Sequence, residues 1–405
     1  MRTAARSKWW PVLVATPLYL VSCTFAVGGL ASARTSGDVD QYERYARLVL
    51  DGRIPYADFY VDYPPGAFPA WILPALVADD DYLTAFKLEM AVVGLLAMFT
   101  MAWILDRLGT SGRRSVVALC AVAVSPLALG HPFLNRFDPW PALLVVLALA
   151  AVLAARDRLT GALLSAGFAV KAYAVVVAPM AAVWIARLRG RLALTAAVVS
   201  GVLVGIAAFG PFATLGLGGI GNTYQTQATR HLQVESLAAS PFLVADELGL
   251  LEVRTALLPP GSIDLVGTGP DVAAAVTSLL QLALVLLVAF VYWRRPDRDG
   301  RLVAAFAASV AAFVAFGKVL SPQFLVWLVF LVPLVGGRRG LAATALLLCA
   351  LGLTQLELEG YESLRPEGWA VWVLLARNLT LVALFGVLLH AVSDEGRRIE
   401  RGSRS

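Results

Sequence analysis

The sequence predicts an all-α polytopic membrane protein with about ten to twelve transmembrane helices. Of its 405 residues, 59% are hydrophobic and only 15% are charged, whereas a soluble domain is about half apolar and about a quarter charged. The apolar residues form long runs, and short arginine clusters separate many of these runs. This composition excludes an ordinary soluble enzyme, a disordered chain and a disulfide scaffold. The 3 cysteines all lie in apolar runs, where they are most simply small core residues.

Full crossings of the membrane are expected wherever an apolar run is close to the length of a bilayer span. These runs are 9–31, 86–105, 115–130, 139–155, 192–213, 273–293, 302–317, 322–336, 341–356 and 369–391. The stretch 159–186 is too short for two ordinary spans, so it predicts two short tilted helices or a re-entrant hairpin buried at its apex. Ala31-Ser32-Ala33 resembles a signal-peptide cleavage site, but the run before it is long, which favours an uncleaved anchor.

The arginine clusters predict the orientation of the chain, because basic residues concentrate in cytoplasmic loops. They lie around residues 2–8, 107–114, 156–158, 187–191, 294–301, 338–339 and 397–404. Both termini are therefore expected in the cytoplasm of a cell whose plasma membrane holds the protein. We expect residues 1–405 to form a single integral membrane domain. Two outer connections, 32–85 and 214–272, are too long for simple turns, and long connections are usually functional; a passive cap is the alternative.

The first outer connection predicts an interfacial helix on the outer leaflet. Residues 42–50 place apolar side chains on one helical face, and Asp51-Gly52 is a plausible stop. Asp38 stands where an N-cap would stand. It is either a cap or a catalytic carboxylate that takes a proton from an acceptor hydroxyl, and the two roles are compatible.

Further along this connection, Pro64 and Pro65 bar a helix and predict a rigid turn. The apolar residues 67–77 can then dip back as a short segment. Asp58 and Asp62 could bind a divalent cation, but they lie in an extended stretch without a nearby histidine. We therefore expect neither a metal nor another cofactor.

Two lysines lie at membrane depth, where an ionisable residue usually faces a cavity and has a partner. Lys171 stands at the apex of the stretch 159–186, and Lys318 at the outer end of a span. Both are expected near the outer face, where they could hold an anionic phosphate. The alternative for Lys318 is snorkelling to the interface.

The second outer connection carries a dense polar group that includes Arg230, His231, Gln233 and Glu235. Such a group suits a sugar or phosphate site, because sugars are recognised by convergent hydrogen bonds. A solvated polar loop would look similar. A third, short outer connection contains His131, which is ambiguous between loop filler and ligand, together with Asn135, Arg136 and Asp138. His390 ends the last span and is expected to be structural.

Several of these residues stand in an order that resembles bacterial glycosyltransferase family 87, a GT-C-type group of membrane mannosyltransferases typical of actinobacteria. The resemblance runs from about residue 36 to about residue 330. It rests on Asp38-x-x-x-Tyr42, Gly52-x-x-Pro55-Tyr56-x-Asp58-Phe59, Tyr63-Pro64-Pro65, Lys171 after a Gly/Ala-rich helix, Arg230-x-Leu232-Gln233-x-Glu235-Ser236, and Lys318-Val319-Leu320-Ser321-Pro322-Gln323. One departure is Asp62, where glutamate is expected before Tyr-Pro-Pro.

The resemblance implies a GT-C-like fold and an enzyme that transfers a hexose, usually mannose, from a polyprenyl-phosphate donor at the outer face. Its key acid maps onto Asp38, with Asp40 as runner-up. The acceptor would be a glycolipid or glycan, with membrane lipid as a further partner and no nucleic acid. A nucleotide-binding motif is absent from the sequence. The expected groups that bind the donor phosphate and sugar are Lys171, Lys318, Arg230, His231, Gln233, Glu235, Tyr63, Asp58 and Gln323.

Two other functions fit the sequence. A transporter or flippase of lipid-linked sugars would also use a broken helix that carries a lysine. Against it, no internal repeat is visible and the polar groups gather on one face. A non-catalytic subunit of an envelope-synthesis complex is the other alternative, and it predicts that Asp38 can be replaced without loss.

Overall fold

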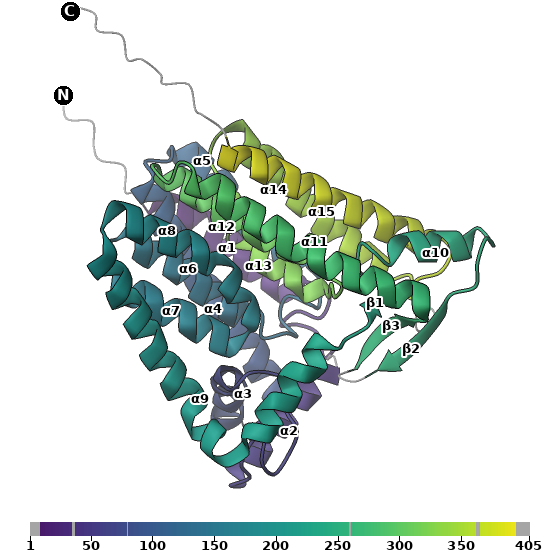
Figure 1. Ribbon diagram of the computed structural model, residues 1–405. Coiled ribbons are helices and arrows are strands. Elements are labelled where there is room, and N and C mark those ends of the chain that lie inside the picture. The colour runs from purple at the N-terminus through teal and green to yellow at the C-terminus, as the bar shows by residue number, and fades with distance from the viewer. Residues whose placement is uncertain (1–8, 35–36, 79, 259–260, 362–364, 394–405) are drawn as a thin grey trace, which may run out of the picture.

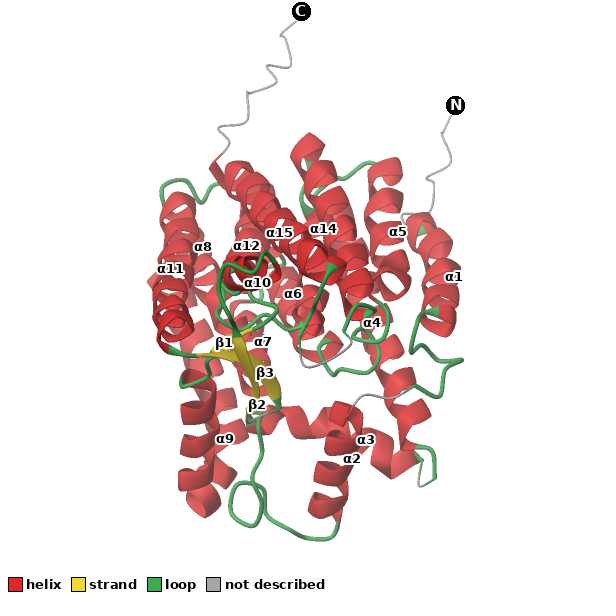
Figure 2. Ribbon diagram, turned by 90° about the vertical axis from the view of Figure 1, so that its right-hand side faces the viewer, coloured by secondary structure: helices red, strands yellow, loops and turns green. Residues whose placement is uncertain are grey.

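The computed structural model describes residues 9–34, 37–78, 80–258, 261–361 and 365–393. These residues form a bundle of α-helices with one small sheet (Figures 1 and 2), which confirms the predicted all-α class. Within the described ranges, 6 helices are long and apolar enough to cross a membrane, so the chain is a membrane protein. They are α4 (Tyr82–Arg107), α5 (Gly112–Leu129), α9 (Arg191–Ala228), α11 (Thr268–Trp293), α14 (Gly337–Leu358) and α15 (Trp369–Ser393).

The remaining helices are shorter. The bundle also contains α1 (Trp10–Phe25), α6 (Pro139–Leu153), α7 (Asp157–Val170), α8 (Ala178–Leu188), α12 (Asp299–Ala315) and α13 (Leu325–Val329). The connecting segments carry α2 (Gly37–Leu50), α3 (Phe68–Val77) and α10 (Ser240–Glu247). Four 3-10 helices complete the described elements: η1 (Pro65–Ala67), η2 (Ala172–Val177), η3 (Pro322–Phe324) and η4 (Val332–Leu334).

The core of the bundle lies around residues 325–335, where α13 and η4 are buried at every position. The expected crossing 322–336 is not one continuous helix, because η3, α13 and η4 follow one another in it; whether it crosses the membrane stays a prediction. Pro322 and Pro333 stand at the first turns of η3 and η4, because proline fits the start of a helix but not its interior. An apolar run that is covered by protein on all sides has the same composition as one that faces lipid, so hydropathy alone could not separate them.

The first outer connection contains the expected helix, α2, followed by η1 and α3. Tyr42 of α2 stacks on Trp71 of α3, with ring centroids 5.2 Å apart and planes 6° apart. Gly52 has a φ of +82°, which gives the turn that follows the helix. The prediction that Asp38 occupies the N-cap is wrong: α2 begins at Gly37, so Asp38 lies in the first turn. A carboxylate there still interacts favourably with the helix dipole.

The stretch 159–186 is built from α7, η2 and α8, and Lys171 is the extended residue between α7 and η2. This arrangement has the two short helices that the sequence predicts, with the lysine at their junction. Whether the pair crosses the membrane fully stays a prediction.

The second outer connection is shorter than expected, because α9 does not end near residue 213. It continues to Ala228 across a kink at Gly216, whose φ and ψ are −152° and 41°. After it come three antiparallel strands that the sequence did not predict: β1 (Leu232–Gln233), β2 (Arg254–Leu258) and β3 (Ser262–Val266), in the order β1-β3-β2. Leu265 of β3 pairs with both Leu232 and Thr255.

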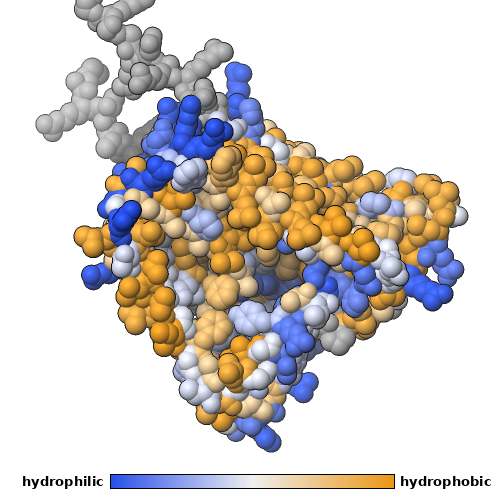
Figure 3. Space-filling view, viewed as in Figure 1, coloured by the Kyte–Doolittle hydropathy of each residue, from blue (hydrophilic) through white to orange (hydrophobic). Residues whose placement is uncertain are grey.

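The ends of several helices lie together at one end of the bundle, which is here called the arginine end. Contacts between residues far apart in sequence join them there: Arg107 with Leu153, Arg114 with Val335, Arg189 with Asp157, and Arg339 with His390. Hydrophilic surface gathers at this end in Figure 3. The terminal basic clusters around 2–8 and 397–404 lie outside the described residues, but α1 begins and α15 ends here.

Candidate active site

A cavity of about 490 Å³ lies among the helix ends and connections opposite the arginine end. Figure 3 shows a hollow with hydrophilic surface near the centre of the view. The cavity is built from the connections that the sequence placed outside. Its polar and ionisable lining includes Asp38, Asp62, Tyr63, His131, Arg136, Lys171, Gln227, Arg230, Gln233, Glu235, Lys318, Ser321, Gln323 and Tyr361.

Asp38 reaches the cavity from the first turn of α2 and forms an ion pair with Arg136. Arg136 belongs to the short connection between α5 and α6, and burial lowers its pKa to about 10. The guanidinium therefore keeps its charge near neutral pH. The pair fixes the direction of the Asp38 carboxylate at the cavity wall, and the Asp38 side chain keeps 28% of its exposure.

Asp62 joins α2 to the segment that precedes the two prolines. Its Oδ2 accepts hydrogen bonds from Gln41 Nε2 at 2.6 Å and from Tyr45 Oη at 3.1 Å. The other carboxylate oxygen is buried without a hydrogen-bond partner. Asp62 thus ties α2 to the segment that contains the next residue, Tyr63, which also lines the cavity.

Lys171 lines the cavity, and its positive charge is paired with a buried carboxylate. Its ammonium lies 2.8 Å from Asp138 Oδ1, and the indole N–H of Trp327 donates to the same oxygen at 2.6 Å. Aromatic rings surround the ammonium, with centroids 4.9 Å away for Phe137 and 5.3 Å away for Phe324. Such faces attract a cation. A lysine with these partners can remain at membrane depth and still face a ligand.

Arg230 and Lys318 add positive charge to the same cavity. The Lys318 ammonium donates to the Ala228 carbonyl at 2.8 Å, and Arg230 donates to the side chain of Gln227 at 3.4 Å. Burial lowers the pKa of both groups. The charge of Arg230 lowers the pKa of Lys318 further, and the nearby acid Asp264 opposes the shift in both. Cations gathered in a confined cavity provide a binding site for an anion such as a phosphate.

Glu235 adds an acidic side chain to the lining of the cavity. Its carboxylate accepts a hydrogen bond from Gln233 Nε2 at 3.1 Å, and its backbone carbonyl accepts one from Arg377 Nη2 at 2.9 Å. Burial, and then the nearby carboxylate of Glu357, raise the pKa of Glu235 to about 8. Arg377 lies 3.3 Å from Glu357, and both of these side chains are completely buried.

The structure brings most of the predicted site residues together: Asp38, Tyr63, Lys171, Arg230, Gln233, Glu235, Lys318 and Gln323 line the cavity. Three others do not line it. Asp40 is exposed on α2, and Asp58 accepts a hydrogen bond from the Ile54 backbone N–H at 2.7 Å within a turn. His231 contacts Asp271 at the surface, with 2.8 Å between Nδ1 and Oδ1.

The sequence analysis did not assign several contributors to the site, among them Arg136, which pairs with Asp38. Trp327 and Tyr361 line the cavity, and Asp138 supports it from behind. A tryptophan inside an apolar run looks like any core residue, so nothing in the sequence around Trp327 indicates that it lines a cavity. A lysine at membrane depth predicts an acidic partner, but the sequence does not identify Asp138 as that partner.

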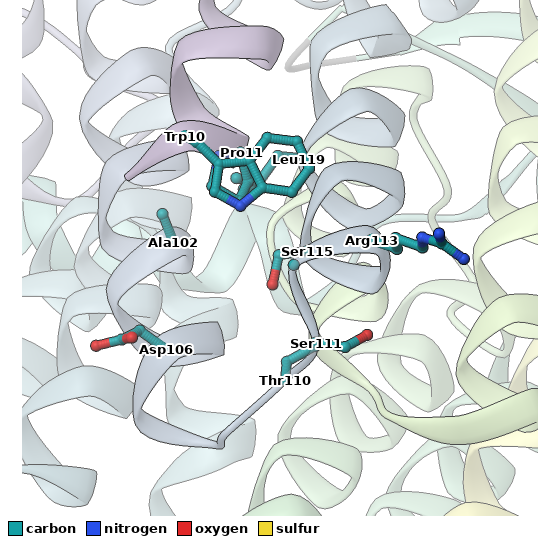
Figure 4. Close-up of a pocket in the computed structure, with 10 residues that line it drawn as sticks. Trp10, Pro11, Ala102, Asp106, Thr110, Ser111, Arg113, Ser115 and Leu119 are labelled. Atoms are coloured by element: carbon teal, nitrogen blue, oxygen red, sulfur yellow. The ribbon is translucent and has the colours of Figure 1, made fainter. Parts of the chain in front are cut away.

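A second cavity of about 560 Å³ lies at the arginine end (Figure 4). Trp10, Asp106 and Arg113 are among its lining residues. It contains none of the residues predicted for the site. Within the described ranges, no group of 3 or more His, Cys, Asp or Glu side chains is arranged to hold a metal ion.

Comparison with known proteins identifies the family. A comparison with curated proteins finds none that matches the chain. The model of glycosyltransferase family 87 matches residues 60–322, which is more than half of the 405 residues. The match contains Asp62, Lys171, Arg230, Glu235 and Lys318 but not α2 with Asp38. The chain belongs to glycosyltransferase family 87.

Proposed function

We propose that this glycosyltransferase moves a hexose, most simply mannose, from a polyprenyl-phosphate donor to an acceptor hydroxyl at the outer face of the plasma membrane. The observation that carries the proposal is the composition of one cavity: a carboxylate, Asp38, and three basic side chains, Lys171, Arg230 and Lys318, line it together. A lipid-linked sugar phosphate needs cations for its phosphate, and a hydroxyl acceptor needs a base.

In the proposed reaction, the Asp38 carboxylate takes the proton of the acceptor hydroxyl. The hydroxyl oxygen attacks the anomeric carbon and forms the new glycosidic bond with inversion. The bond between that carbon and the phosphate oxygen breaks, and its electron pair leaves with the polyprenyl phosphate. Lys171, Arg230 and Lys318 stabilise the negative charge of this leaving group. The ion pair with Arg136 directs the Asp38 carboxylate before each turnover.

The orientation follows from the distribution of charge. The arginine end contains the basic clusters that the positive-inside rule assigns to the cytoplasm, and the cavity lies at the other end. Both termini then lie in the cytoplasm, and α2 lies at the outer interface. A donor at this interface can keep its polyprenyl chain in the bilayer while its phosphate enters the cavity.

The test is sugar transfer by membranes that contain the wild type, Asp38→Asn or Glu43→Gln. Labelled polyprenyl-phosphomannose would be the donor, with a panel of envelope glycolipids and glycans as acceptors, with and without EDTA. Glu43 is a matched control because it is an acid of the same helix that pairs with Arg47 at 3.1 Å on the solvent side. We expect transfer by the wild type and the control, loss in Asp38→Asn, and no effect of EDTA.

Each contrary result has a distinct meaning. Full activity of Asp38→Asn would remove Asp38 as the base, and Asp40→Asn would then be measured. Loss in both Asp38→Asn and Glu43→Gln would show that the amide substitution harms α2 itself. Failure of the wild type with every acceptor would contradict the donor, and a flipping assay with the same labelled lipid would test the transporter function.

A further inference from the structure

The connection from α1 to α2 is held by a buried lysine that has no place in the proposed chemistry. Lys87 is the sixth residue of α4, and only 1% of it is exposed. Its ammonium donates to three backbone carbonyls: Gly29 at 3.3 Å, Ser32 at 2.7 Å and Arg34 at 2.8 Å. An ammonium group has three N–H donors, so these three carbonyls use all of them.

A lysine in this place is costly unless it has a specific task, because burial removes water from its charge. The three carbonyls that Lys87 binds belong to one short segment, 29–34, and α2 follows this segment closely in sequence. The segment has no helix or strand of its own to pair its carbonyls. Lys87 therefore replaces secondary structure as the support of this connection.

The middle and the first turn of α2 are held by different groups. Its middle is held by Tyr42, which stacks on Trp71, and by the bonds from Gln41 and Tyr45 to Asp62. Its first turn, with Asp38, is held by the ion pair to Arg136. These contacts of the middle of α2 do not involve Lys87, whereas the segment 29–34 that Lys87 binds precedes the first turn in sequence.

The α5–α6 connection contacts Gly28, the residue just before this segment. Asn135 Nδ2 donates to the Gly28 carbonyl at 3.3 Å, and the next residue, Arg136, pairs with Asp38. Gly28 has a φ of +71°, and a Cβ there would lie 2.5 Å from His131 Cβ. The backbone before α2 is thus fitted closely against the connection that directs the Asp38 carboxylate.

We propose that Lys87 is a positioning residue for Asp38: its ammonium fixes the connection 29–34 and thereby the first turn of α2. The proposal rests on the proposed function only where it assigns catalysis to Asp38. Displacement of a catalytic group by about 1 Å can cost about a hundredfold in rate, so a support of the backbone can matter as much as a group in the cavity.

The test combines amide hydrogen exchange with transfer kinetics on the full chain in nanodiscs. Lys87→Met keeps the length of the side chain but removes the ammonium, and Lys87→Arg keeps a charge and its donors. Met90→Leu is the matched control, because Met90 is a fully buried residue of the same helix and its replacement conserves volume. Exchange in α14 reports whether each variant keeps the bundle intact.

We expect Lys87→Met to speed exchange at least about tenfold in residues 29–34 and in the first turn of α2, with α14 unchanged. Its kcat should fall about ten- to a hundredfold while KM for the donor stays the same. Lys87→Arg should recover part of both losses. In an Asp38→Asn background, Lys87→Met should cause no further loss, because the group that it positions is already gone.

Unchanged exchange in 29–34 and the first turn would overturn the proposal, whatever the activity. An additional loss of rate in the Asp38→Asn background would also overturn it, because Lys87 would then act apart from Asp38. Faster exchange in α14 in both Lys87 variants would assign Lys87 to the stability of the whole bundle instead. The exchange measurement needs no substrate, so it separates this proposal from a failure of the proposed transfer reaction.

Discussion

Lys171 and Asp138 form an ion pair with 2.8 Å between Nζ and Oδ1, and the Asp138 side chain is completely buried. The Lys171 side chain keeps 13% of its exposure and lines the cavity. The positive charge of the pair therefore faces the cavity, and the negative charge of Asp138 lies behind it. The ammonium has three donors, and one of them is used by Asp138. This arrangement gives a fixed cation that can still meet a phosphate.

Replacement of Asp138 by asparagine should leave the Lys171 charge buried without its counter-ion. Removal of one partner of a buried pair costs about 3–5 kcal/mol of folding free energy. We expect Asp138→Asn to lower the unfolding temperature in detergent strongly. The double variant Asp138→Asn, Lys171→Met should recover much of the stability but not transfer activity. If the double variant is no more stable than the single one, the pair is not the reason for the loss.

Lys171 shows which parts of the site can be predicted from the sequence. A lysine between two short apolar helices predicts a cavity, a partner and the outer face, and the structure places it beside a cavity and an ion-pair partner. The identity of the partner needed the fold, because 33 residues separate Asp138 from Lys171. Hydropathy and charge are local signals, whereas ion pairs between helices depend on packing.

The errors have physical causes of the same kind. The end of α9 was placed too early because Gly216 and its neighbours weaken the helix pattern without ending the helix. The run 322–336 predicts one continuous helix, but Pro322 and Pro333 each begin a separate short 3-10 helix in it. The strands β1 to β3 are short and lie in a polar connection, where alternation over so few residues is a weak signal.

Lys318→Met should weaken the use of the donor. The Lys318 ammonium keeps one bond to the Ala228 carbonyl, so its other donors can reach the phosphate. A hydrogen bond to a charged group contributes about 1.5–3 kcal/mol, which corresponds to about a ten- to hundredfold loss of kcat/KM. Lys318→Arg should lose less. Unchanged kcat/KM with a lower unfolding temperature would show that Lys318 only caps the end of α9.

Glu235 should make stability fall as the pH rises. Unfolded glutamate loses its proton near pH 4.5, whereas burial and Glu357 raise the pKa of Glu235 to about 8 in the folded chain. Between these values the folded state binds more protons than the unfolded state, so the free energy of unfolding decreases with pH in that window. Glu235→Gln has no such proton and should flatten this decrease. Unfolding curves from pH 5 to about pH 8 for both proteins would measure it; equal slopes would contradict the role of Glu235.

Gly219 tests the contact between α9 and the first outer connection. A Cβ at Gly219 would lie 2.0 Å from the Tyr56 carbonyl oxygen, and backbone cannot move aside as a flexible side chain can. Tyr56 has a φ of 68° and donates from its hydroxyl to the Tyr63 carbonyl at 2.6 Å. A shift of Tyr56 therefore moves Tyr63 at the cavity wall. We expect Gly219→Ala to cost about 1–3 kcal/mol of stability and to reduce transfer.

Gly218 gives this prediction its matched control, because a Cβ there meets nothing within 4 Å and the residue belongs to the same helix. Gly218→Ala should keep or raise stability by about 0.5–1 kcal/mol, since alanine favours a helix over glycine. Thermal unfolding and donor kinetics of both variants would be compared with the wild type. Equal behaviour of the two variants would show that α9 does not lie against Tyr56, whereas a loss confined to Gly219→Ala ties the position of α9 to the shape of the cavity.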